Sequence, residues 1–507
     1  MPEERLSVWI LGDQLLRDHP ALAAAEAAVG KSNIHVVMIE SQKRTAQRPY
    51  QRKKLVLIYS AMRHYAQMLR EQGYHVDYYT SAESMTHALQ QHKELWRPEK
   101  LLTMAASEYF PRLYQTDHLS AALNIPVEVL PNTQFLIGRY NPYPEPEKRL
   151  VMENFYRKMR RHFDVLMDSE DAPAGGEWNY DKQNRKPLPK NVALPDIPQF
   201  QPDETTQQVM ADVAAGDGVG QVDGFCYAVT HQQAEAALHD FIETRLQDFG
   251  AYEDAMTTRQ GTLFHAILSP YINLGLLEPL QMIAAVEAAY REGRAPINSV
   301  EGFVRQVLGW REYMYWQYWQ QMPDLAHKNH WNAAQPMPRF FWNGDTEMNC
   351  LHHVITRVID TGYTHHIERL MVVSNFCLMA GIEPRAVLEW FMSFYIDAYD
   401  WVMQPNVIGM GLNADGGRTA TKPYIASANY INKMSDYCQG CRYQHTQRTG
   451  DDACPFNYLY WNFLIANEDE LRANPRTGRN VLNLRHLDDE ERARVQQQAE
   501  VFIRSLG

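Results

Sequence analysis

The first 130 residues alternate between short apolar runs and longer amphipathic segments. Four apolar runs, each followed by a polar residue, predict buried strands at 6–12, 34–40, 75–80 and 100–106. Segments 55–74 and 84–95 carry apolar residues at helical spacing. Strands that alternate with helices predict a parallel, doubly wound sheet.

Polar side chains follow these strands. In a doubly wound sheet, ligands bind at the carboxyl ends of the strands. The residues at those ends are Gly12, Asp13, Gln14, Glu40, Ser41, Ser107 and Glu108. The chain contains neither GxGxxG nor GxxxxGK[ST], so it gives no support for an ordinary dinucleotide or P-loop site.

The pattern changes at residue 131. Residues 131–225 are dense in proline and charge, and we expect a long connector with one helix near 150–168. This helix carries four basic residues, Arg157, Lys158, Arg160 and Arg161. They could form an ordinary solvated face or a surface that contacts DNA phosphates.

From residue 226 onward the apolar spacing is helical, and the tail at 480–507 reads as a charged surface helix. We therefore expect an α/β domain at 1–130, a connector at 131–225 and an all-α domain at 226–507.

Composition narrows the class of protein. Of the 507 residues, 45% are apolar and 22% charged, as in ordinary globular proteins, which excludes a disordered chain. No run is long enough to span a membrane, and the N-terminus lacks a secretory pattern, so we expect a cytoplasmic protein with reduced thiols. The net charge of −12 argues against a uniformly basic nucleic-acid coat but leaves room for a local basic groove.

The cysteines suggest a metal site. Cys438 and Cys441 form a CxxC pair, and Cys454 follows shortly after. Because a four-coordinate site needs one more ligand, Cys350 is the candidate, while Cys226 and Cys377 read as core residues. Spacing alone does not separate zinc from an iron–sulfur cluster.

Seven of the eleven tryptophans lie between residues 310 and 401. Such a cluster could be a large aromatic core, a base-stacking surface or a relay for single electrons, since tryptophan and tyrosine are the side chains most easily oxidised.

Several motifs resemble the photolyase and cryptochrome family. LSPYINLGLL (268–277), GWREYMYW (309–316), HHIERLM (365–371), IDAYDW (396–401) and PNVIGM (405–410) are similar to its flavin-binding segments. The four cysteines with KPY and NYINKMS between them, and the LGDQL opening, resemble the iron–sulfur bacterial branch, which contains prokaryotic (6-4) photolyases and related cryptochromes. The resemblance covers essentially the whole chain.

The resemblance implies three cofactors: FAD in the helical domain, a [4Fe-4S] cluster on Cys350, Cys438, Cys441 and Cys454, and a 6,7-dimethyl-8-ribityllumazine antenna in the α/β domain. It also implies light-driven repair of (6-4) pyrimidine–pyrimidone lesions in UV-damaged DNA by a bacterial protein, which we expect to be monomeric. The lesion would be flipped out of the duplex.

The resemblance assigns roles in repair. His366 would donate a proton to the lesion with His365 as a supporting neighbour, and histidine suits this role because its pKa lies near neutrality. Tyr424 and Tyr430 would form a wall that faces the lesion. The contacts to DNA phosphates would come from Arg157, Lys158, Arg160, Arg161, Arg185 and Lys186.

It also implies the cofactor contacts. Leu268 and Ser269 would lie at the FAD phosphates, Arg369 and Asp397 would pair beside the isoalloxazine, and Asn406 would face its reactive nitrogen. The remaining flavin residues would be Gln306, Trp310, Arg311 and Glu312, and the antenna residues Gly12, Asp13, Gln14 and Glu40.

Photoreduction of the flavin would use Trp390 and Trp342. Residue 391 is phenylalanine, where the resemblance leads us to expect a more easily oxidised tyrosine, so another aromatic neighbour such as Trp401 could take part.

Two alternatives remain at this point. One is a blue-light receptor of the cryptochrome type with the same cofactors, and the other is a zinc-stabilised nucleic-acid-binding protein without flavin.

Overall fold

The computed structural model describes residues 5–145 and 150–506. The expectation that the N-terminus lacks a secretory pattern falls partly on residues 1–4, which lie outside the described residues. A five-stranded sheet of order β3-β2-β1-β4-β5 forms the N-terminal domain. All of its pairings are parallel. Its strands are β1 Leu6–Trp9, β2 Ile34–Ser41, β3 His75–Ala82, β4 Lys100–Met104 and β5 Val127–Leu130.

The four predicted strands are confirmed, whereas β5 was not predicted. This last strand lies at the sheet edge and is only partly buried, so its short VEVL sequence lacks the apolar run that marks β1, β2 and β4.

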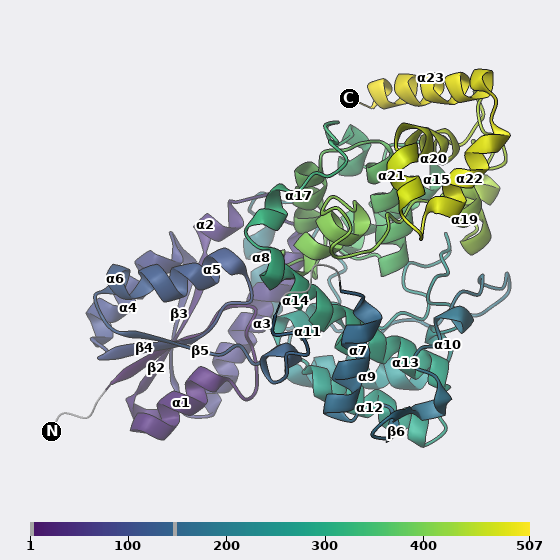
Figure 1. The fold of residues 1–507 in the computed structure, drawn as a ribbon. Coiled ribbons are helices and arrows are strands. Elements are labelled where there is room, and N and C mark those ends of the chain that lie inside the picture. Colours follow the sequence, from purple (N-terminus) through teal and green to yellow (C-terminus); the bar gives the residue numbers. More distant parts are fainter. Residues whose placement is uncertain (1–4, 146–149, 507) are drawn as a thin grey trace.

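Helices cover both faces of the sheet, which confirms the doubly wound architecture (Figure 1). Val8 and Val36 pack with α1 and α3, whereas Trp9 and Val37 pack with α4 and α6 on the other face. The helices of this domain are α1 Pro20–Val29, α2 Gln42–Thr45, α3 Arg52–Glu71, α4 Met85–Trp96, α5 Tyr109–Leu113 and α6 Leu119–Leu123.

The connector contains more structure than its composition suggests. The predicted helix is present as α7 Met152–Phe163, and a small antiparallel hairpin follows, β6 Met167–Ser169 and β7 Ala172–Pro173. A second helix, α8 Glu204–Ala214, packs on α3 and was not predicted, because only a narrow stripe of its residues is buried.

The C-terminal half is helical, as predicted; between residues 226 and 506 the described chain forms isolated β-bridges but no strand. The tail is two helices, α22 and α23, rather than one, and α23 packs on α20 (Figure 1). The helices are α9 His231–Thr244, α10 Leu246–Phe249, α11 Ser269–Leu274, α12 Pro279–Arg291, α13 Ile297–Val304, α14 Glu312–Gln321, α15 Asn349–Thr361, α16 Asn375–Met379, α17 Pro384–Phe394, α18 Asp400–Met403, α19 Ala428–Met434, α20 Pro455–Ala466, α21 Glu468–Ala473, α22 Gly478–Leu482 and α23 Asp489–Ser505.

Four stretches of the described chain have π-helical hydrogen bonding: Tyr114–His118, Arg305–Arg311, Glu368–Ser374 and Gln404–Gly411. Such stretches are rare and occur frequently at functional sites. No helix among the described residues is both long enough and apolar enough to cross a bilayer.

Candidate functional site: two large cavities and a cysteine cluster

A cavity of about 320 Å³ lies inside the helical domain. Three of the four π-helical stretches contribute to its wall, together with the start of α11 and the segment around Asp397. The predicted residues that line it are Leu268, Ser269, Gln306, Trp310, Arg311, His366, Arg369, Asp397 and Asn406. We call it the helical-domain cavity.

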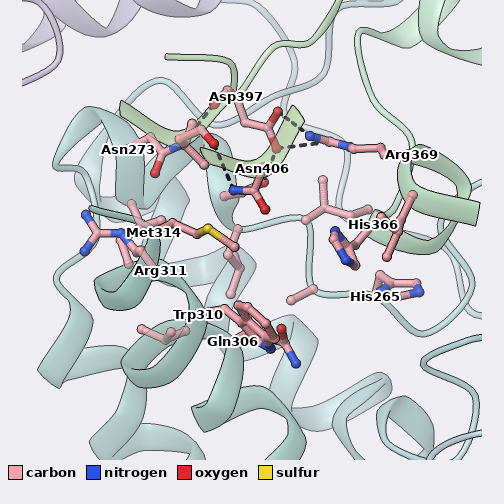
Figure 2. Close-up of a pocket in the computed structure, with 18 of the residues that line it drawn as sticks. His265, Asn273, Gln306, Trp310, Arg311, Met314, His366, Arg369, Asp397 and Asn406 are labelled. Atoms are coloured by element: carbon pink, nitrogen blue, oxygen red, sulfur yellow. Dashed lines mark hydrogen bonds and ion pairs between the residues drawn. The ribbon is translucent and has the colours of Figure 1, made fainter. Parts of the chain in front are cut away.

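An ion pair organises one wall of this cavity. Figure 2 shows Asp397 between Asn273 and Arg369, with His366 on the Arg369 side. The guanidinium donates to both carboxylate oxygens of Asp397 at 2.9 and 3.0 Å, and the Ser269 hydroxyl donates to the same carboxylate at 2.6 Å. Burial raises the pKa of Asp397, but the Arg369 charge and these hydrogen bonds bring the pKa below its usual value. The Ser269 hydroxyl is thus used by Asp397, whereas it was expected at a phosphate.

Arg311 lies in the cavity wall, and part of its guanidinium has no hydrogen-bond partner. Its Nη1 donates to Glu312 at 2.8 Å and to the Gln134 carbonyl at 3.2 Å. Its Nε and Nη2 are buried without a hydrogen-bond partner. Glu312, which was expected in the wall, lies behind it, where its carboxylate holds Arg311 and accepts the Ile137 N–H at 2.9 Å.

The two histidines face different ways. His366 lines the cavity with an exposed side chain, and the surrounding protein, followed by Arg369, lowers its pKa. His365 is fully buried outside the cavity wall and stacks on His265, with ring centroids 4.3 Å apart. Its Nε2 lies 3.7 Å from a carboxylate oxygen of Glu368. His365 therefore supports the wall from behind.

Glu253 is a cavity residue that sequence reasoning missed. Its carboxylate accepts a hydrogen bond from Gln306 Nε2 at 2.7 Å. Burial raises the pKa of Glu253 to about 8, although the nearby Arg305 charge opposes the shift. No sequence motif marks this glutamate, because the packing of α13 and the chain around residue 253 creates its environment.

The two predicted tyrosines do not line the cavity. Tyr430 donates to Asp254 at 3.4 Å, next in sequence to Glu253, and Lys422 lies over the Tyr424 ring at 5.4 Å. Tyr430 therefore contacts the chain next to a cavity residue, whereas the contact of Tyr424 is with Lys422, which does not line the cavity.

The two tryptophans expected in photoreduction are connected by phenylalanines. Phe391 lines the cavity and its ring lies 5.2 Å from that of Trp390. The Phe394 ring lies 4.9 Å from Trp390 and 5.3 Å from Trp342, which is 46% exposed. The aromatic path thus leads from the cavity to the surface, with Phe391 at its inner end. Trp401 lies in the cavity wall itself.

A second cavity, of about 660 Å³, lies at the carboxyl ends of the strands, where a doubly wound sheet places its ligands. We call it the sheet-edge cavity. It is lined by Gly12, Asp13, Ser107 and Glu108, and on the side of the helical domain by Met392, Ala398 and Tyr399. The fourth π-helical stretch, through Tyr114 and Gln115, completes part of its wall.

Two of the expected antenna residues point elsewhere. Gln14 donates to the Met104 and Ala105 carbonyls at 3.4 and 3.0 Å, and Glu40 pairs with Arg63 at 2.8 Å. Successive strand residues face opposite sides, and Ile39 and Ser41 line the cavity, so Glu40 faces away from it.

Charged groups line the sheet-edge cavity. Burial and the nearby Glu108 raise the pKa of Asp13 to about 6, although Asp13 accepts a hydrogen bond from Ser107 at 2.6 Å. Glu108 pairs with Arg44 at 2.7 Å. Lys54 and Arg44 were not predicted, because the fold brings them here from α3 and α2.

Four cysteines, Cys350, Cys438, Cys441 and Cys454, line one small cavity between α15, α19 and the start of α20. Burial raises the pKa of Cys350 well above its usual value, and the charges of the other three thiolates would raise this pKa further. Among the described residues, no three or more His, Cys, Asp or Glu side chains are placed to hold a single metal ion. Cys226 and Cys377 lie apart from this group.

The basic residues of α7 do not share one face. Arg160 is fully buried, and its guanidinium donates to the Val165, Leu166 and Trp178 carbonyls. It therefore cannot reach a DNA phosphate, and its expected role is wrong. The other five predicted contacts remain partly or fully exposed: Arg157, Lys158, Arg161, Arg185 and Lys186.

Comparisons with known proteins agree on one group. Residues 8–227 match a family model described as deoxyribodipyrimidine photo-lyase-related protein. The chain is 42% identical over 508 residues to a (6-4) photolyase of Agrobacterium fabrum. The alignment covers 98% of this chain and 99% of that protein.

Two solved structures share the fold. A bacterial class III photolyase from Agrobacterium tumefaciens aligns with a TM-score of 0.61 at 15% identity. The alignment covers 100% of this chain and 98% of the photolyase chain. A cryptochrome of Synechocystis sp. PCC6803 aligns with a TM-score of 0.60 at 16% identity and covers 100% of both chains.

Proposed function

Because this chain belongs to the photolyase and cryptochrome family, we propose that it is a light-dependent lyase that repairs (6-4) pyrimidine–pyrimidone photoproducts in UV-damaged DNA. The observation that carries this proposal is the helical-domain cavity, whose wall combines the Arg369–Asp397 pair with His366. These residues would hold reduced FAD, which would supply the electron needed for light-driven repair without a net redox change.

The wall of the cavity suits a flavin nucleotide. Arg311 lines the cavity, and its guanidinium, packed over the Phe135 and Trp401 rings, would place a positive charge near a bound phosphate. The Arg369–Asp397 pair adds polar groups without net charge, and Asn406, whose amide donates to the Val402 carbonyl at 2.8 Å, is held in a fixed orientation. Leu268, Ser269, Gln306 and Trp310 would complete the contacts.

His366 is the proposed proton donor, since it lines the cavity with an exposed side chain, whereas the other histidine of the wall, His265, is buried and stacks on His365. The surrounding protein, followed by Arg369, lowers the pKa of His366, so its imidazole is neutral near pH 7. The negative charge that the lesion acquires would raise this pKa and favour the protonated imidazole. His365 positions the segment through its stack on His265.

DNA would bind with the lesion flipped toward this cavity, because its reacting atoms are inaccessible in the base stack. We propose phosphate contacts from Arg157, Lys158, Arg161, Arg185 and Lys186, and a place beside the lesion for Tyr424 and Tyr430. With a net charge of −12, the affinity depends on such a local set of cations.

Cys350, Cys438, Cys441 and Cys454 are the proposed ligands of a [4Fe-4S] cluster. The four cysteines surround one small cavity, which would give such a cluster four thiolate ligands. The site lies between α15, α19 and α20. We propose that the cluster has a structural role there.

The sheet-edge cavity is the proposed site of the 6,7-dimethyl-8-ribityllumazine antenna. Asp13, Glu108, Arg44 and Lys54 would bind its polar edge and ribityl hydroxyls. Gly12 lets the strand end pack against α3, since a Cβ at this position would lie 2.7 Å from the Met62 sulfur. Two cofactors in neighbouring cavities would allow light absorbed by one to excite the other.

We further place the protein in the bacterial cytoplasm as a monomer, in a reducing compartment that would preserve the cysteine ligands. A cryptochrome-type receptor is the second candidate, because a cryptochrome shares the fold to nearly the same extent as a photolyase.

The deciding experiment uses two oligonucleotides, one with a (6-4) lesion and one with a cyclobutane dimer. The protein is purified anaerobically and reduced, and repair is measured under blue light and in darkness. Light-dependent repair of the (6-4) substrate alone would support the proposal. A flavin-loaded protein that repairs neither substrate would instead favour the receptor.

A further inference from the structure

A single segment of the chain separates the two large cavities. Asp397 and Trp401 line the helical-domain cavity, whereas Ala398 and Tyr399, which lie between them in sequence, line the sheet-edge cavity. Consecutive residues thus face different cavities. We call residues 397–401 the shared wall.

Lys54, on α3, holds this wall from the sheet-edge side. It is only 3% exposed, and its Nζ donates to the Ala398 carbonyl at 2.6 Å and to the Met392 carbonyl at 3.2 Å. No ion pair within 4 Å connects Lys54 to a carboxylate of the described residues. Since an ammonium group has three N–H donors, one remains for a molecule in the cavity that Lys54 lines.

On the other side, the same wall carries the flavin contacts. The Asp397 carbonyl accepts a hydrogen bond from Asn273 at 3.0 Å, and its side chain holds Arg369 and Ser269. The Lys54 bond to Ala398 and the Asn273 bond to Asp397 therefore hold successive peptide groups from opposite cavities. A shift of either bond would displace the Asp397 carboxylate relative to Arg369.

We propose that Lys54 couples the two cavities: a ligand with a carbonyl or ring-nitrogen acceptor in the sheet-edge cavity takes the third Lys54 hydrogen, fixes the shared wall and thereby tightens the binding of FAD on its other side. The inference rests on the proposed two-cofactor function and adds a thermodynamic link between the cofactors.

The electrostatics around Lys54 support this role. Burial, and secondarily Arg48, lower the pKa of Lys54 to about 7, while Asp397 and Glu108 oppose the shift. Near neutral pH the ammonium form is then only partly populated when the cavity holds no acceptor. A ligand acceptor would favour the ammonium form and so both hydrogen bonds to the wall.

Linkage makes the proposal quantitative. If the antenna raises the affinity for FAD by some factor, FAD must raise the affinity for the antenna by the same factor. Allosteric couplings of this kind are typically about 5–150-fold, and we expect a value in the lower part of that range because only one wall is shared.

The test measures FAD dissociation constants by flavin fluorescence on the full chain, with and without 6,7-dimethyl-8-ribityllumazine. In the unchanged protein the lumazine should tighten FAD about fivefold. Lys54→Met should abolish this dependence. Lys43→Met is the matched control, since Lys43 lines the same cavity but is exposed and forms no hydrogen bond or ion pair with the shared wall. This variant should retain the coupling.

Binding of lumazine without any change in FAD affinity, or unchanged coupling in Lys54→Met, would overturn the inference while leaving the antenna proposal intact. Absence of lumazine binding would overturn both. If Lys54→Met does not fold, hydrogen exchange of the unchanged protein decides: the amides of residues 392–401 should exchange more slowly when lumazine is bound, and equal exchange rates would refute the coupling.

Discussion

Replacement of Asp397 by asparagine tests the ion pair on which the helical-domain cavity depends. The carboxylate is 5% exposed and accepts three hydrogen bonds, two from Arg369 and one from Ser269. Asp397→Asn keeps the shape of the side chain but places an amide N–H against donors and leaves the buried Arg369 without a counter-charge. FAD content should fall, because the wall that positions the flavin loses its main polar contact.

The expected loss in stability is large. Removal of one partner from a buried ion pair typically costs about 3–5 kcal/mol, and the asparagine carbonyl recovers part of this, so we expect about 3 kcal/mol. The measurement is urea denaturation of the cofactor-free protein, followed by tryptophan fluorescence. Asp212→Asn is a matched control, because Asp212 pairs with Arg63 at 3.1 Å but is 48% exposed, and such pairs contribute about 0–1 kcal/mol.

The pH dependence gives a second readout. Because the folded pKa of Asp397 lies below its unfolded value, the ionised carboxylate stabilises the protein above the unfolded pKa of about 3.9. The difference between Asp397→Asn and the unchanged protein should therefore stay constant from neutral pH down to about pH 4 and shrink only below it. If Asp397→Asn lost no more stability than Asp212→Asn, the pair would not hold the wall and the reasoning would be refuted.

Three further predictions concern repair and the cofactors. His366→Ala should keep FAD but lower light-driven repair about 100-fold or more, the typical contribution of a general acid, and normal repair would remove His366 from the mechanism. Cys438→Ser should lose the brown absorbance of the cluster and much of the soluble protein; iron content at the level of the unchanged protein would contradict the ligand assignment. Trp390→Phe should slow photoreduction of bound FAD, measured as bleaching of flavin absorbance, without impairing repair by chemically reduced protein. Trp331→Phe is the control for this variant, because Trp331 packs on Phe463 outside the cavity wall. Equal bleaching rates in both variants would point to Trp401 instead.

Burial explains part of what the sequence predicted. Strands β1, β2 and β4 are buried on both faces, so their apolar runs are continuous and easily recognised. The edge strand β5 and helix α8 bury only part of their surface, and their patterns are correspondingly weak. The half-exposed strand β3 and the surface helix α23 were predicted nonetheless, β3 from its place between two helical segments and α23 from its charged pattern.

For the sites, sequence predicted which segments meet but not always which side chains face inward. Arg157, Lys158, Arg160 and Arg161 span more than one helical turn, so they cannot all face solvent, and Arg160 falls on the buried side of α7. Glu253 and Lys54 carry no local signal, since their altered pKa values arise from neighbours distant in sequence. Such residues become visible only when the packing of the domains is known.

The distribution of the π-helical stretches gives a physical reason why the cavities exist at all. A regular α-helix packs its side chains against its neighbours, whereas a π-helical turn widens the backbone and shifts the register of the following side chains. All four described stretches border one of the two large cavities: three at the helical-domain cavity and one at the sheet-edge cavity. Each irregularity costs some helical stability, and a cofactor bound at the widened turn would restore the lost contacts. The cofactors would thus stabilise the fold as well as perform the chemistry, which is why a wall shared between them can transmit the binding of one to the affinity for the other.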